Sequence, residues 1–176
     1  MNRKQRRATR AQKLPVLHVR GSDLAANLPS QAHAMLADLR SMLETDWNDE
    51  RPELTFFCQG GDGRAYQVTP ERVGVEEKPL LVGTLMEFFA ERDVTSYTFI
   101  MEAMGSQQMS VLPSEASDCR EMLIVGAVDA DGHKAVGTYF VECDADGKRS
   151  LGEWSASRDP VFWATQLLGA EPRTVH

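Results

Sequence analysis

The tetrapeptide Asp-Ala-Asp-Gly occurs twice, at Asp129–Gly132 and Asp144–Gly147, and these residues are the first candidates for chemistry. A helix-loop-helix calcium site needs oxygen ligands at the first, third, fifth and twelfth loop positions and glycine at the sixth. With Gly147 at the sixth position, the second copy has acidic residues at all four of these places, namely Glu142, Asp144, Asp146 and Glu153. The first copy fails the same test, because Ala127 and Thr138 stand at its ends.

The residues around the second tetrapeptide favour strands rather than the helices of a calcium site. The preceding stretch "AVGTYFV" is β-branched and aromatic, which is typical of a strand. Arg149 also stands where such a loop normally has an apolar anchor. Asp-Gly between two strands has a simpler cause, since a hairpin turn requires the positive φ that glycine tolerates freely. We therefore predict two hairpin turns and no metal site; the alternative is weak cation binding by Asp144, Asp146 and Glu153.

Three further groups of residues also suggest chemistry. The "GGDG" stretch, Gly60–Gly63, offers backbone amides to a phosphate, but phosphate loops lead into a helix and this one leads into the strand-like "AYQVT". Cys119 has Arg120 beside it, which can activate a thiol, but no base or oxyanion donor accompanies it. No metal-ligand spacing relates the histidines, which are His18, His33, His133 and His176. We predict no catalytic residue, no metal ligand and no cofactor.

The N-terminal segment "MNRKQRRATRAQK" holds six basic residues and no acidic one, and these are Arg3, Lys4, Arg6, Arg7, Arg10 and Lys13. In a helix, its four arginines would lie on one side, although their mutual repulsion opposes that helix in water. A helix that forms only against a polyanion is consistent with this pattern. The segment resembles short arginine-rich RNA-binding peptides, including those of phage antiterminators. We expect residues 1–13 to form a solvated flexible tail and residues 14–176 to form a single domain. The alternatives for the tail are binding to nucleic acid and contact with the acidic surface of its own domain or of a neighbouring copy.

Composition separates this tail from an acidic body. The chain of 176 residues has a formal charge of −7, but residues 14–176 hold 13 basic against 26 acidic residues and so carry −13. This length can form one stable domain without disulfides. Three cysteines without Cys-x-x-Cys spacing indicate reduced thiols and a cytoplasmic location. No apolar run reaches the ~20 residues of a membrane span, so we expect no membrane association.

Hydrophobic spacing predicts two helices, and capping residues indicate a third. The first begins at Pro29, and its apolar residues recur at helical intervals, at Ala32, Met35, Leu36, Leu39, Met42 and Leu43. The second begins at Pro79, with a strong apolar face at Leu81, Leu85, Phe88 and Phe89. The third is short and lies between Asp159, a suitable N-cap, and Gly169, a suitable C-terminal stop.

Strands are expected between and after these helices. A short strand, "LPVLHVR" (14–20), precedes a loop, "GSDLAANLPS", and a hairpin pairs "ELTFFCQ" with "RAYQVT" through the "GGDG" turn. Residues 96–104 form a strand, and a polar stretch follows over 105–120. Three more strands, "EMLIVGAV", "HKAVGTYFVEC" and "KRSLGEW", are joined by the two acidic tetrapeptides. Runs of consecutive strands predict an α+β fold, in which about three helices pack on an antiparallel sheet that ends in a β-meander.

The segment "PSEASDCREMLIVGAVDADG", residues 113–132, resembles a segment of bacterial and phage-associated proteins of unknown function. The shared features are a Pro-Ser-Glu loop, an Arg-Glu pair and an apolar strand that ends in an acidic turn. The opening "MNRKQRRA" is similar to the start of many bacterial and phage reading frames. The resemblance implies a bacterial or phage origin, and it carries no activity and no functional residue.

These observations lead to the expectation of a small, soluble, non-enzymatic binding or accessory protein. We expect it to engage a protein partner, through the 105–120 stretch and the outer strand "KRSLGEW". The alternative is a nucleic-acid-binding regulator that uses the six basic residues of the tail. A small enzyme built around Cys119 or a carboxylate cluster is a third hypothesis.

Overall fold

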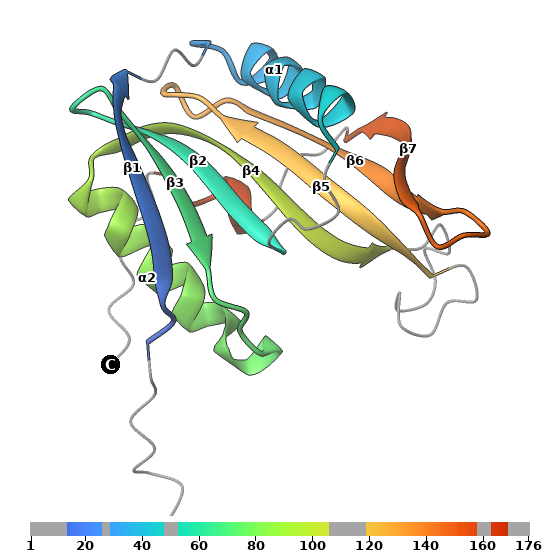
Figure 1. Cartoon of the computed structure of the whole chain (residues 1–176). Helices are drawn as coiled ribbons and strands as arrows, with labels where there is room; N and C mark the ends of the chain where they lie inside the picture. The colour runs from blue at the N-terminus through green and yellow to red at the C-terminus, as the bar shows by residue number, and fades with distance from the viewer. Residues whose placement is uncertain (1–13, 26–28, 48–52, 106–118, 158–162, 169–176) are drawn as a thin grey trace, which may run out of the picture.

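The chain folds around one antiparallel sheet of seven strands (Figure 1). The structure, a computed structural model, describes residues 14–25, 29–47, 53–105, 119–157 and 163–168. The strand order in the sheet is β1-β3-β2-β4-β5-β6-β7. The strands are β1 (Leu17–Ala25), β2 (Leu54–Gly60), β3 (Arg64–Pro70), β4 (Val94–Gly105), β5 (Arg120–Val128), β6 (Lys134–Cys143) and β7 (Arg149–Ala156). The predicted hairpin and the C-terminal meander are both confirmed.

Two α-helices cover opposite faces of the sheet (Figure 1). Helix α1 (Ala32–Thr45) packs on β4, β5 and β6. Helix α2 (Lys78–Glu91) packs on the other face and is preceded by a short 3-10 turn, η2 (Val75–Glu77). A second 3-10 turn, η4 (Trp163–Thr165), lies near β5. The fold class is therefore α+β, with two α-helices in the described part of the chain where about three were expected.

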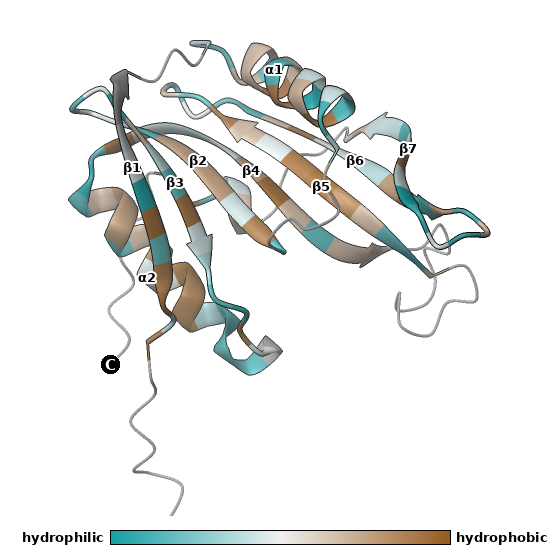
Figure 2. Ribbon diagram, in the orientation of Figure 1, coloured by the Kyte–Doolittle hydropathy of each residue, from teal (hydrophilic) through white to brown (hydrophobic). Residues whose placement is uncertain are grey.

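Each helix closes a separate apolar core. The α1-side core contains Met35, Leu39 and Leu43 of the helix, packed on buried residues of β4, β5 and β6, including Leu123 and Tyr139. The α2-side core packs the apolar face of α2 on aromatic residues of the sheet, and it includes Leu85, Phe89, Phe56, Tyr97 and Phe99. Figure 2 shows hydrophobic residues concentrated along the central strands and hydrophilic residues in the turns. Strand β5 lies in the interior of the sheet, and its apolar residues contribute to both cores.

Helix α1 begins at Ala32, three residues later than predicted from Pro29. Gln31 takes the N-cap position in an extended conformation, with φ −115° and ψ 136°. The N–H of Ala32 finds its acceptor far away in sequence, at Oδ2 of Asp129, at 3.1 Å. Because that acceptor lies outside the helix, local sequence did not reveal the true start. The second helix agrees with prediction, with Pro79 in its first turn.

Strand β1 extends further than the sequence indicated. The expected strand ended at Arg20, whereas pairing with β3 continues through Ser22 and, after an irregularity, reaches Ala25. Five residues of the expected "GSDLAANLPS" loop therefore belong to the strand. The backbone of β3 supplies the hydrogen-bond partners for this extension, so tertiary pairing overrides the weak strand preference of Gly21 and Ser22.

The predicted third helix, from Asp159 to Gly169, is not formed over the described residues 163–168, where only η4 is found. The carbonyl oxygen of Ala164 accepts a hydrogen bond of 2.7 Å from the hydroxyl of Tyr97. Ala164 and Leu167 are buried in the α2-side core. These contacts hold a short 3-10 turn on the sheet where the capping residues had indicated a helix.

Candidate functional site

Both acidic tetrapeptides are hairpin turns, as predicted. In each, the first aspartate accepts hydrogen bonds through Oδ1 from the N–H groups two and four residues later, at distances of 2.8–3.1 Å. The glycine of each turn, Gly132 or Gly147, has φ of +80°. Asp144 accepts from Asp146 and Lys148 within its own turn, between β6 and β7. The "GGDG" turn likewise joins two strands, with Gly63 at φ +77°.

The two tetrapeptide turns differ in the role of the first aspartate. Asp129 is buried, with an exposed fraction of 2%, and its Oδ2 accepts from the N–H of Ala32 at 3.1 Å and lies 3.2 Å from Nδ1 of His133. Burial opposes ionisation of this carboxyl, but the N–H groups of Ala32 and His133 and the His133 ring together lower its pKa below the ordinary value. Asp129 therefore joins the β5–β6 turn to the start of α1.

Folding also brings together three side chains that could hold a metal ion, a group that sequence spacing did not predict. Ligand atoms of Asp129, Asp131 and His133 lie within 4.8 Å of one another. Both carboxylate oxygens of Asp129 already have partners, however: two N–H groups at Oδ1, and Ala32 and His133 at Oδ2. The turn and the contact with the start of α1 together account for the position of the Asp129 carboxylate.

The cysteines occupy three different environments. Cys58 is buried in the α2-side core, and this burial raises the pKa of its thiol well above the usual range, so the thiol stays protonated. Cys119 is partly exposed at the start of β5, and Cys143 is exposed at the end of β6. Arg120, which could have activated the neighbouring Cys119, has its guanidinium 4.3 Å from the centre of the Phe140 ring. The described contacts of Arg120 are thus with an aromatic ring.

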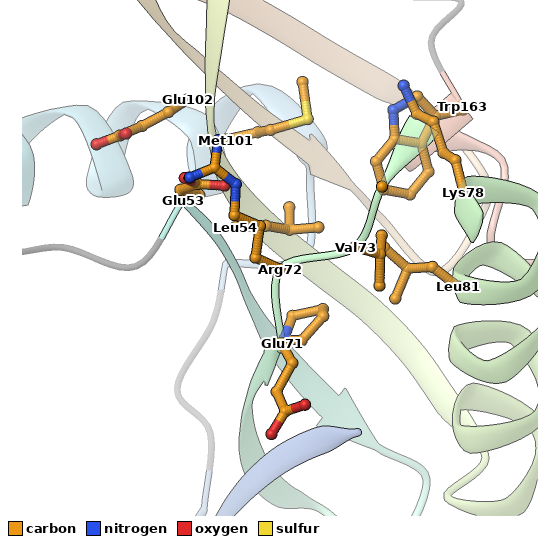
Figure 3. A pocket seen from close by; sticks show the side chains of 12 residues that line it. Glu53, Leu54, Glu71, Arg72, Val73, Lys78, Leu81, Met101, Glu102 and Trp163 are labelled. Atoms are coloured by element: carbon orange, nitrogen blue, oxygen red, sulfur yellow. The ribbon is translucent and has the colours of Figure 1, made fainter. Parts of the chain in front are cut away.

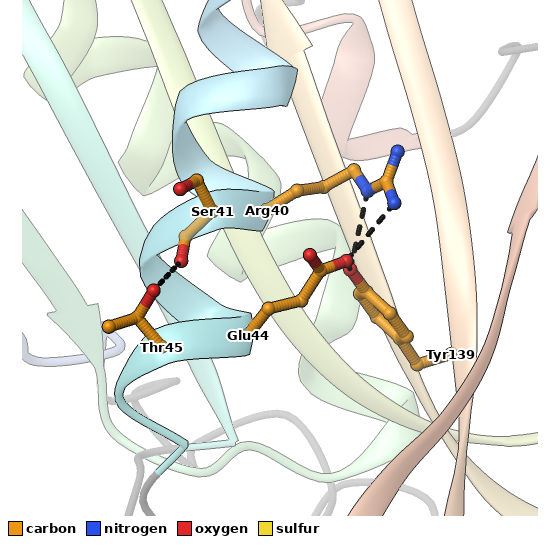
Figure 4. Close-up of polar contacts among 5 residues, drawn as sticks. All are labelled: Arg40, Ser41, Glu44, Thr45 and Tyr139. Carbon is orange, nitrogen blue, oxygen red and sulfur yellow. Dashed lines mark hydrogen bonds and ion pairs between the residues drawn. The ribbon is translucent and has the colours of Figure 1, made fainter.

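A polar group holds the second half of α1 on the sheet (Figure 4). Arg40 Nη2 lies 3.0 Å from Oε1 of Glu44, and its Nε donates to the Tyr139 hydroxyl at 3.3 Å. Tyr139 in turn donates to Oε1 of Glu44 at 2.6 Å, and the Arg40 guanidinium lies 4.3 Å from the ring centre of Trp154. The same view shows the Thr45 hydroxyl donating to the backbone carbonyl oxygen of Ser41 at 2.7 Å. This arrangement stabilises the contact between α1 and β6, and its residues are not those of a nucleophilic site.

A cleft lies at one end of the sheet and is here called the sheet-end cleft (Figure 3). It has a volume of about 510 Å³ and lies between the ends of β2, β3 and β4, the start of α2 and the η4 turn. Its lining residues are Glu53, Leu54, Pro70, Glu71, Arg72, Val73, Gly74, Lys78, Leu81, Met101, Glu102 and Trp163. This volume is within the range of ligand pockets.

Apolar groups form the floor of the sheet-end cleft, and charges of both signs surround it. The floor consists of apolar side chains that are part of the α2-side core or pack against it, namely Leu54, Val73, Leu81 and Trp163. At the rim, Nη1 of Arg72 lies 3.0 Å from Oε1 of Glu53, and Nζ of Lys78 lies 5.5 Å from the ring centre of Trp163. Glu71 and Glu102 complete the rim. An apolar centre with a polar rim is the usual pattern of a protein interface.

Exposed apolar residues adjoin this cleft on the β1 side. Val16 is 36% exposed and Leu14 is 61% exposed. The carbonyl oxygen of Val16 accepts a hydrogen bond from the N–H of Glu71, which lines the cleft. Sequence reasoning missed the cleft, since its residues come from four separated parts of the chain and no spacing relates them.

The predicted nucleic-acid-binding residues, Arg3, Lys4, Arg6, Arg7, Arg10 and Lys13, lie outside the described residues. So do residues 106–118, which make up most of the polar stretch proposed as a partner-binding surface. The other proposed surface, "KRSLGEW", includes most of β7, which forms one edge of the sheet. No helix in the described part of the chain is long and apolar enough to cross a membrane.

Comparison with models of known protein families, with curated proteins and with solved structures finds no match to this chain.

Proposed function

We propose that this chain is a non-enzymatic binding protein, and that the sheet-end cleft receives an apolar side chain of a protein partner. The observation that carries the proposal is the combination of an apolar floor with a rim of mixed charge in a cavity of about 510 Å³. Buried apolar anchors surrounded by polar contacts supply most of the energy in protein interfaces. The exposed side chains of Leu14 and Val16 add apolar surface beside the cleft.

The charges around the cleft favour a protein over a nucleic acid at this site. Three carboxylates, on Glu53, Glu71 and Glu102, outnumber the two cations, on Arg72 and Lys78. Nucleic-acid affinity depends on neutralising phosphates with an excess of positive charge. The formal charge of −13 on residues 14–176 opposes such binding across the whole body of the protein.

A charge placed on the cleft floor tests the proposal. Val73→Lys puts an ammonium group where the apolar anchor of the partner would sit, and Met42→Lys, on the exposed side of α1, is the matched control. Both variants and the wild-type chain are used to capture proteins from a lysate of the source cells, with quantitative mass spectrometry. We expect at least one protein that binds the wild type and Met42→Lys but is reduced about tenfold or more by Val73→Lys.

Equal capture by all three proteins, with circular dichroism showing that each is folded, would refute the role of the cleft. A protein lost with Val73→Lys alone identifies the partner. Its cellular location then tests the expectation of a cytoplasmic protein, and the neighbouring genes test the expected bacterial or phage origin.

The second candidate function is nucleic-acid binding by the N-terminal segment, favoured by its six basic residues without an acidic one. If about five phosphates are contacted, affinity falls with salt along a log–log slope of about −4. Gel shifts of the full chain and of residues 14–176, over a series of salt concentrations, measure this directly. Loss of binding in the shorter chain supports the tail as the site, and absence of binding by the full chain at low salt refutes it.

A further inference from the structure

Strand β1 leaves one edge of the sheet open, since no described strand pairs with its outer side. On the inner side, Val16 accepts from Glu71, and Leu17 lies opposite Pro70, which has no N–H to donate. Hydrogen-bonded and non-hydrogen-bonded pairs alternate along an antiparallel ladder. The backbone N–H and C=O groups of Leu17, Val19 and Gly21 therefore point outward.

We propose that this edge pairs with β1 of a second copy of the chain, in an antiparallel dimer centred on Val19. A two-fold axis at Val19 places the two outward-facing Val19 backbones opposite each other, where each donates to and accepts from the other. The same register pairs Leu17 with Gly21 of the second copy and His18 with Arg20 of the second copy. The result is one continuous sheet across the two chains.

The side chains on the α2 face are complementary in this register. Val19 is 40% exposed, and the dimer covers it with the same residue of the second copy. Gly21 leaves room for Leu17 of the second copy, because a Cβ at Gly21 would meet only the Tyr66 ring, at 3.8 Å. The incoming leucine would therefore pack beside an aromatic ring rather than against a second side chain. A large residue opposite a small one on both halves of the interface favours this register.

Charges on the other face are also complementary. Glu71 lies 3.5 Å from His18 Nε2, and both side chains are exposed. In the dimer, Arg20 lies opposite His18 of the second copy, so its long side chain can reach Glu71 of that copy. The two-fold axis repeats this ion pair, giving two complementary contacts in one interface.

The opposite edge of the sheet lacks these properties. The β6–β7 ladder has an irregularity between Tyr139 and Val141, and Arg149 of β7 is engaged with Glu121 at 2.8 Å. Bulges and charges of this kind are common protections of edge strands. From Leu17 to Ser22, β1 is paired in regular register and contains neither lysine nor proline. The two edges thus differ in a way that favours pairing at β1.

The first test removes a single outward N–H. Val19→Pro deletes the central donor without removing a bond to β3, and proline is tolerated where the N–H of an edge strand faces outward. Val19→Thr keeps both the N–H and the β-branched shape, and is the matched control. Sedimentation of the full chain over a concentration series measures the dimer. Because only five residues of each chain are paired, the interface is small, and we expect a dissociation constant of about micromolar or weaker. We expect this constant to be unchanged within about threefold by Val19→Thr and raised about tenfold or more by Val19→Pro.

The second test exchanges charges at exposed positions that leave the fold intact. Arg20→Glu and Glu71→Arg should each weaken the dimer, and the double variant should restore it. A chain that stays monomeric at every concentration would overturn the proposal. So would a dimer that ignores Val19→Pro, or one that the double exchange does not restore. Sedimentation reports self-association alone, so this outcome is independent of whether the cleft binds a partner.

Discussion

Tyr139 on β6 and Glu44 on α1, 95 positions apart in sequence, are joined by a hydrogen bond of 2.6 Å from the phenolic hydroxyl to Oε1 (Figure 4). This bond holds the second half of α1 against the sheet. Arg40 donates hydrogen bonds to both residues, through Nε to the Tyr139 hydroxyl and through Nη2 to Oε1 of Glu44. The Tyr139 hydroxyl is the main cause of a lowered pKa of Glu44, followed by Arg40, whereas burial raises the pKa of Tyr139. This contact therefore makes stability depend on pH.

Replacing Glu44 with glutamine should reduce the loss of stability in acid. A carboxyl whose pKa is lowered on folding stabilises the protein above its unfolded pKa, near 4.5, and this contribution is lost as the pH falls through the folded pKa. Urea unfolding of the wild type and Glu44→Gln over an acidic pH series measures the difference. Tyr139→Phe, which removes the main cause of the shift, should flatten the same part of the profile. Parallel profiles for all three proteins would contradict this.

Removing the Asp129 carboxylate should destabilise the protein far more than removing that of Asp144. Both form the same turn, but Asp129 is buried and also caps α1 through Ala32. Asp129→Ala is expected to lower the free energy of unfolding by about 2–4 kcal/mol, because the variant loses both the cap on α1 and the buried hydrogen bonds of the turn. Asp144→Ala should have a smaller effect, because its turn is exposed. Urea denaturation compares the two, and equal losses would show that the cap on α1 contributes nothing.

Two glycine substitutions should act in opposite directions. A Cβ at Gly126 would lie 2.3 Å from the Phe99 ring, which is fully buried, so Gly126→Ala should cost about 1–3 kcal/mol through overpacking. Gly83 lies within α2 with nothing within 4 Å of an added Cβ, so Gly83→Ala should stabilise by about 0.5–1 kcal/mol through helix preference. Thermal unfolding of both variants checks the prediction. A destabilised Gly83→Ala would mean that the exposed side of α2 is constrained by another contact.

Alkylation should distinguish the cysteines. The Cys58 thiol is buried and its pKa is raised, so it should not react with iodoacetamide at neutral pH while the protein is folded. Cys143 is exposed and should react at the rate of an ordinary thiol. Peptide mass spectrometry over a time course gives the rate at each site. A rate at Cys119 well above that of Cys143 would favour the enzyme hypothesis over the proposed binding function.

Local signals were sufficient to predict most elements of the fold. The Asp-Gly pairs indicated both tetrapeptide turns, and β-branched and aromatic residues between turns indicated the strands of the meander from β4 to β7. The periodic leucines of α2, beginning after Pro79, gave its start to within one residue. These features depend on the preferences of neighbouring residues, which a single sequence records directly.

The remaining features depend on contacts between distant segments. The start of α1 is set by Asp129, and the absence of a helix over 163–168 goes with the bond from Tyr97 to Ala164. The sheet-end cleft is formed by residues near positions 54, 72, 101 and 163, which only the strand order brings together. The open edge of β1 likewise depends on the strand order, because β1 pairs with β3 and no described strand pairs with its other side.

The bond from Ala32 to Asp129 spans 97 positions, and this has a consequence for how the chain matures on the ribosome. Helix α1 leaves the exit tunnel long before the residue that caps it has been synthesised. During that interval its first turn lacks its native acceptor, and its apolar side lacks β5 and β6. Packing of the α1 half of the protein must therefore wait for the β5–β6 hairpin, so α1 is synthesised early and yet is among the last of the described elements to reach its stable packing.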